Sequence, residues 1–98
     1  MIKVYINKKN IKISGHAMFD DYGKDIVCAS VSSIVITSIN GILRLDKSAI
    51  KYDLNKDGID IDILKEDKVT NELISNMISL FKELEKNYSK NIKIYEEV

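Results

Sequence analysis

Two side chains able to do covalent chemistry lie close together in this sequence, Cys28 and His16, and each is the sole residue of its type among 98. A thiolate is a strong nucleophile, and an imidazole can take up the thiol proton and return it to a leaving group. The pair also has a simpler explanation, because unpaired cysteine is among the most buried residue types and histidine in a turn is common. The two residues alone therefore leave both a catalytic dyad and a packed thiol open.

The stretch DIVCASVSSIVITSING (25–41) predicts the element that would position Cys28. Its apolar residues recur at spacings of three and four, which is typical of one face of a helix. Asp25 is a favourable N-cap residue and Gly41 is favourable just past a helix C-terminus, so we expect the helix to lie between them. Cys28 then falls in the first turn, where unpaired N–H groups and the helix dipole stabilise a thiolate and can hold an oxyanion.

Two further residues would support such a dyad. Asp25 lies on the same side of the helix as Cys28, and it either orients His16 or serves only as the cap. Ser32 follows Cys28 by one turn and would face the same pocket. One cysteine and one histidine are too few ligands for a protein-only zinc site, so we expect no metal and no cofactor.

The other elements follow from periodicity and turn signals. An apolar stripe predicts a second helix over 70–87, and alternating or β-branched residues predict strands over 2–6, 11–14, 48–54, 59–64 and 92–98. The order ββαββαβ predicts a two-layer α+β fold, a mixed sheet with two helices packed on one face. The length predicts a single domain over 1–98.

The turn between the third and fourth predicted strands resembles a calcium site. Asp53, Asn55, Asp57 and Gly58 match the opening of an EF-hand loop. That loop needs a bidentate glutamate at its twelfth position, where this chain has Leu64. We therefore interpret NKDG as a hairpin turn.

Composition narrows the functional class. Fifteen basic and fifteen acidic residues give a net charge of zero, which argues against a general nucleic-acid or membrane surface. We find no run of about 18 apolar residues, so we expect no membrane-spanning helix, and the N-terminus lacks the apolar run of a signal peptide. A lone cysteine makes no internal disulfide, so we expect a cytoplasmic protein.

The segment GHAMFDDYGKDIVCASVS (15–32) resembles the signature of the bacterial ribosomal-processing cysteine protease family known as Prp. In that family a Gly-His-Ala turn precedes a short loop with a glycine and then Asp-Ile-Val-Cys-Ala-x-Val-Ser. The matching residues are Gly15, His16, Ala17, Gly23, Asp25, Ile26, Val27, Cys28, Ala29, Val31 and Ser32. One departure is Met18, where members often carry glycine, and it puts the conformation of the loop 17–24 in question.

The resemblance implies Cys28 as nucleophile and His16 as general base. Asp25, Ser32, Gly15 and Gly23 would be the supporting residues. It further implies a homodimer that removes the N-terminal extension of large-subunit ribosomal protein number twenty-seven, with that precursor as partner and no direct nucleic-acid or membrane partner. Two other classes stay open: a non-catalytic peptide-binding or ribosome-assembly module, and a redox-sensing thiol that would need an intermolecular disulfide.

Overall fold

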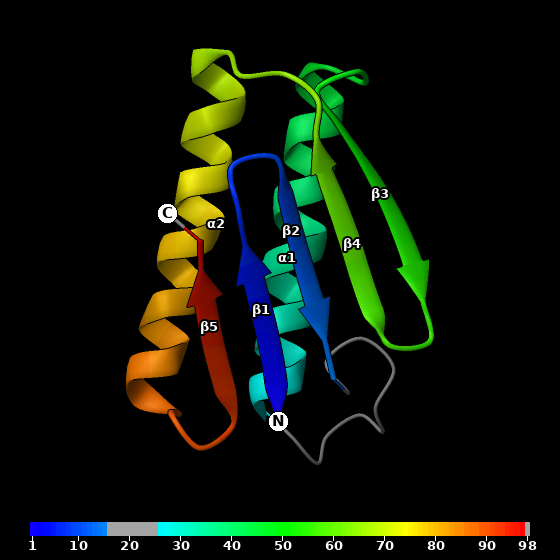
Figure 1. Ribbon diagram of the computed structural model, residues 1–98. Helices are drawn as coiled ribbons and strands as arrows, with labels where there is room; N and C mark the ends of the chain where they lie inside the picture. The colour runs from blue at the N-terminus through cyan, green and yellow to red at the C-terminus, as the bar shows by residue number, and fades with distance from the viewer. Residues whose placement is uncertain (16–25, 98) are drawn as a thin grey trace.

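The computed structural model describes residues 1–15 and 26–97, which form one five-stranded mixed sheet with two helices on one face (Figure 1). The elements in chain order are β1 (Ile2–Ile6), β2 (Asn10–Ser14), α1 (Ile26–Leu45), β3 (Ile50–Asn55), β4 (Gly58–Ile63), α2 (Lys68–Asn87) and β5 (Ile92–Glu96). The strand order is β3-β4-β2-β1-β5, in which only the β1–β5 pair is parallel. The predicted α+β fold and its ββαββαβ order are confirmed.

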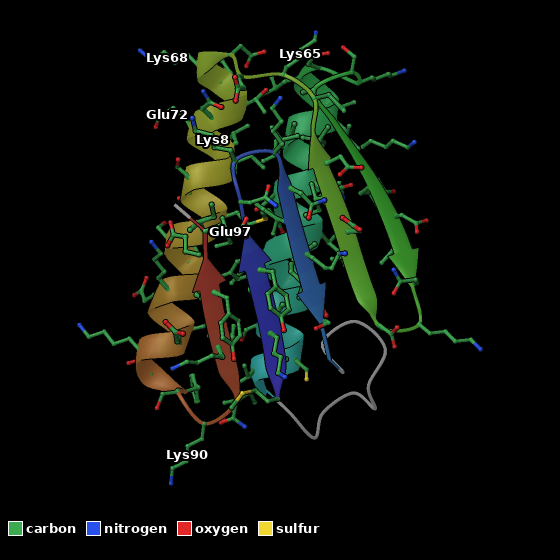
Figure 2. All side chains as sticks on the ribbon, in the orientation of Figure 1. Lys8, Lys65, Lys68, Glu72, Lys90 and Glu97 are labelled. Carbon is green, nitrogen blue, oxygen red and sulfur yellow. The ribbon has the colours of Figure 1, made fainter. Side chains whose placement is uncertain are left out.

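The core lies between the sheet and the two helices. β1 buries alternate residues, as a strand with one covered face must. α1 contributes Val31 and Val35 and α2 contributes Met77 and Phe81, all of them 0% exposed. No helix of the described residues covers the opposite sheet face, and its side chains extend into solvent (Figure 2).

Gly41 does not end α1, so the predicted helix end is wrong. The helix continues to Leu45 because the apolar spacing continues at Ile42, which is 1% exposed in the core. α2 likewise begins earlier than predicted, at Lys68. The Asp67 carboxylate accepts a hydrogen bond of 2.8 Å from the backbone N–H of Thr70 and caps the helix there.

Replacing Gly41 with alanine is expected to raise the free energy of unfolding by about 0.5–1 kcal/mol, because glycine costs that much in a helix interior. A Cβ at this position meets nothing within 4 Å. Urea denaturation measures the change. Gly58→Ala is the opposing control, since Gly58 has φ +149° and its added Cβ would overlap the carbonyl of Ile13. A less stable Gly41→Ala protein would contradict the prediction.

α1 has the length and composition of a membrane span, with a mean hydropathy of 2.0 over an 18-residue window. The expectation that no such stretch exists is therefore wrong. A single helix of this kind is weak evidence for a span, because core helices of soluble proteins have the same composition. In this fold a stripe along α1 belongs to the core beneath the sheet: Val27, Cys28, Val31, Val35, Ile39 and Ile42.

Candidate active site

Cys28 lies in the first described turn of α1, at the end of the sheet where β1 begins and β2 ends (Figure 1). It is the third residue of α1 as described, which agrees with the predicted position near the helix start. The positive end of the helix dipole lies at a helix start and favours negative charge, so this position suits a thiolate. His16, Gly23 and the predicted cap Asp25 lie outside the described residues.

The Cys28 side chain is also part of the core. It is 6% exposed and belongs to the same buried cluster as Ile2 and Val31. A thiol this covered reacts only when a substrate group can approach it from the helix start. The position therefore serves packing, and any mutation of Cys28 must be assessed for its effect on stability as well as on activity.

Gly15 determines how the chain leaves β2, directly before His16. Its φ is +111°, and a Cβ there would lie 2.7 Å from the carbonyl oxygen of Met1 and 3.1 Å from the Cα of Ile2. Its N–H donates a 3.0 Å hydrogen bond to the carbonyl of Asp57. The backbone therefore approaches the start of β1 too closely for any side chain, which gives the first glycine of the motif a physical role.

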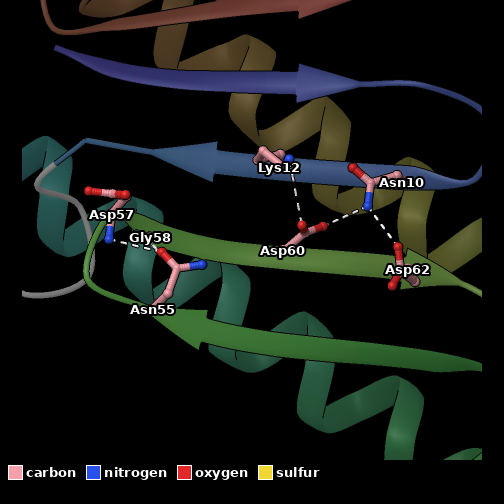
Figure 3. Close-up of polar contacts among 7 residues, drawn as sticks. All are labelled: Asn10, Lys12, Asn55, Asp57, Gly58, Asp60 and Asp62. Carbon is pink, nitrogen blue, oxygen red and sulfur yellow. Dashed lines mark hydrogen bonds and ion pairs between the residues drawn. The ribbon is translucent and has the colours of Figure 1, made fainter.

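Gly58 is a supporting residue that the sequence analysis did not connect with the site. It pairs with Ser14 at the end of β2, and its φ of +149° is accessible chiefly to glycine. The Asn55 side-chain oxygen accepts the backbone N–H groups of Asp57 and Gly58 at 2.9 and 3.1 Å (Figure 3). These two hydrogen bonds close the β3–β4 hairpin beside Gly15. The sequence NKDG predicted this hairpin turn. Within 1–15 and 26–97, no group of three or more His, Cys, Asp or Glu residues could hold a metal.

Replacing Gly15 with alanine is expected to lower the free energy of unfolding by about 1–3 kcal/mol, because a side chain at positive φ is strained and meets the Met1 carbonyl. Urea denaturation measures this loss, with Gly41→Ala as the matched glycine control. Unchanged stability would show that the close approach to β1 is not required.

The two serines near Cys28 differ in their surroundings. Ser30 donates a 2.8 Å hydrogen bond from its hydroxyl to the Ile26 carbonyl, so it is engaged within the helix. Ser32 is half-buried and follows Cys28 by four residues, which places both on one side of α1. That Ser32 supports a reaction at Cys28 stays a prediction.

Surface hollows formed by the described residues lie elsewhere. One of about 490 Å³ is on the open sheet face, and one of about 420 Å³ lies between α1 and α2. Cys28 lines neither of them.

Comparison with known proteins places this arrangement in a family. The chain matches the family described as cysteine protease Prp over residues 1–93. It is 31% identical over 88 residues to the ribosomal processing cysteine protease Prp of Staphylococcus aureus strain Mu50, covering 87% of this chain and 83% of that protein. It is 25% identical over 95 residues to the Bacillus subtilis protein of the same name, covering 87% and 82%.

Solved structures show the same fold. The TM-score is 0.79 with S. aureus Prp in complex with a covalently linked product peptide, at 21% identity, covering 98% of this chain and 97% of that one. It is 0.78 with the same protease in complex with a substrate peptide, at 20% identity, covering 98% and 97%.

Proposed function

Because the chain belongs to the cysteine protease Prp family, and is therefore a cysteine protease, we propose that Cys28 and His16 form its catalytic dyad. The observation that carries this proposal is the place of Cys28 in the first described turn of α1. Gly15, directly before His16, supports it, because its hydrogen bond to the Asp57 carbonyl and its close approach to Met1 hold the end of β2 in place.

The proposed reaction has two halves. The Cys28 Sγ attacks the scissile carbonyl carbon while His16 takes the thiol proton, and N–H groups at the start of α1 stabilise the oxyanion. The C–N bond then breaks, the proton passes from the imidazole to the leaving amine, and a thioester to Cys28 remains. Water, deprotonated by His16, hydrolyses that thioester to a carboxylic acid and regenerates the thiol. Asp25 and Ser32 would orient these groups, and Gly23 would shape the loop between them.

We propose the precursor of large-subunit ribosomal protein number twenty-seven as substrate, processed in the cytoplasm. Support comes from the relatives described as ribosomal processing proteases and from the S. aureus structure with a substrate peptide. Incubation with that precursor, followed by intact mass spectrometry, tests the proposal. A single cut near the N-terminus supports it, whereas an uncut precursor carrying its extension overturns the substrate assignment.

A homodimer is part of the proposal, and the exposed side of α1 supports it. No charged residue occurs between Ile26 and Leu43. Ile36 on that side is 52% exposed. The edge strand β3 leaves Tyr52 and Leu54 about half exposed on the helix side of the sheet, at 45% and 50%. Burying this uncharged surface against a second copy would enlarge the small core of a chain this short.

Replacing Ile36 with lysine is expected to weaken dimerisation by at least about tenfold, because a charge would be desolvated in an apolar contact. Sedimentation equilibrium across a concentration series measures the dissociation constant. Val69→Lys on α2, where Val69 is 54% exposed, is the matched control and should leave the constant unchanged. Equal constants for Ile36→Lys and wild type would exclude this face.

A further inference from the structure

The open face of the sheet carries side chains in rows that cross the strands. In the row nearest the start of β1, Lys93 pairs with Lys3, and Lys3 pairs with Ser14. In the next row, Tyr95 pairs with Tyr5. The two rows are two residues apart on each strand, about 7 Å. One basic row and one aromatic row therefore lie side by side across β5 and β1.

The basic row is electrostatically unbalanced. Lys3 and Lys93 are direct neighbours in register, and like charges in that position destabilise a sheet. In the described part of the chain neither ammonium group forms an ion pair, whereas Lys12 lies 3.7 Å from the Asp60 carboxylate. An anion bound between Lys3 and Lys93 would relieve their repulsion.

The aromatic row presents flat surfaces to solvent. Tyr5 and Tyr95 are 41% and 44% exposed, and their rings stack with centroids 5.1 Å apart and an interplanar angle of 14°. Because β5 is an edge strand, the ring face of Tyr95 turned away from Tyr5 has no neighbouring strand beside it. Both rings line the hollow of about 490 Å³, whose wall also includes Asn7, Asn10 and Glu97.

Apart from Glu96 and Glu97 at the end of the β5 segment, which line the hollow, the acidic residues of this face lie on the other half of the sheet. Asp53 and Asp60 pair with each other across β3 and β4. The Asn10 amide bridges the carboxylates of Asp60 and Asp62 at 2.6 and 2.8 Å (Figure 3). The net charge of the chain is zero, but the charges on the open sheet face are unevenly distributed. The basic and aromatic rows lie on β5 and β1, and the paired aspartates lie on β3 and β4. The composition argument against a nucleic-acid surface does not apply to the basic half.

We propose that the β5–β1–β2 half of the open face binds single-stranded RNA. A phosphate lies between Lys3 and Lys93, and its base contacts the Tyr5–Tyr95 stack one row away. The amides and the two carboxylates lining the hollow offer hydrogen bonds to the edge of the base. Ser14, beside Lys3, offers one to a ribose 2′-hydroxyl, which favours RNA over DNA.

The test is fluorescence anisotropy with a labelled ten-nucleotide single-stranded RNA, carried out on the Cys28→Ala protein so that the result does not depend on proteolysis. Tyr5→Thr and Tyr95→Thr are each expected to weaken binding by at least about fivefold. Lys3→Gln and Lys93→Gln are each expected to reduce the salt dependence, lowering the slope of log affinity against log salt by about 0.7. Tyr88→Thr after α2 and Lys51→Gln on β3, both at exposed positions, are the controls and should bind as the parent does.

Several outcomes would overturn the proposal. Absence of RNA binding at low salt would do so, as would equal losses in the control variants. A poly-glutamate peptide that binds as tightly as the RNA, with no effect of the tyrosine changes, would identify an acidic polypeptide site instead. Equal affinity for DNA of the same sequence would overturn the choice of RNA. Thermal unfolding of each variant separates lost binding from lost folding.

Discussion

Cys28→Ala is expected to abolish cleavage of the ribosomal protein precursor, with a loss of at least about a thousandfold in kcat/KM, because no other nucleophile replaces the thiolate. The fold should persist. Removing a small side chain that is 6% exposed leaves a small cavity, and we expect a loss of about 1 kcal/mol in stability. Timed mass spectrometry of the products measures the first effect, and urea denaturation measures the second.

Three companion measurements make this result specific. Cys28→Ser keeps the shape and should be equally inactive, because a hydroxyl is far less acidic than a thiol. Ser30→Ala in the same turn should retain activity, since that hydroxyl donates its hydrogen bond to the Ile26 carbonyl within the helix. Cys28 is the sole cysteine, so the alkylation rate of the whole protein reports on this one thiol. Retained cleavage by Cys28→Ala would exclude it as nucleophile and favour the peptide-binding module, with Cys28 as a core residue.

His16→Ala is expected to reduce kcat/KM by about a hundredfold to ten thousandfold, the range that a general base contributes. The wild-type rate should fall as the pH decreases through the imidazole pKa, because a protonated imidazole cannot accept the thiol proton. His16 is the sole histidine, so this acidic limb should disappear in the variant. The pH dependence of kcat/KM for both proteins is the measurement.

Free imidazole added to His16→Ala should restore part of the activity, which a purely structural histidine would not allow. Asp25→Asn separates the two roles left open for that residue. If Asp25 serves only as the helix N-cap, Asp25→Asn should change kcat little, because asparagine caps a helix as well as aspartate does. An unchanged pH profile in His16→Ala would exclude His16 as the base and leave Cys28 to be activated at the helix start alone.

The sequence by itself determined the element order and the apolar face of each helix. Periods of two and 3.6 residues are local properties, so Ile2, Val4 and Ile6 are read as one buried strand face without knowledge of the partner strands. The motif from Gly15 to Ser32 is equally local, and it identified the family that the comparisons show.

Only the tertiary structure decided which distant segments meet. Gly41 predicted the end of α1, but the helix continues past it because Ile42 is buried beneath the sheet. The parallel pairing of β1 with β5 brings Lys3 beside Lys93 and Tyr5 beside Tyr95, although about ninety residues separate them along the chain. The close approach of Gly15 to Met1 has the same origin. Strand pairing is set by the packing of the whole core, so no local window of sequence contains it.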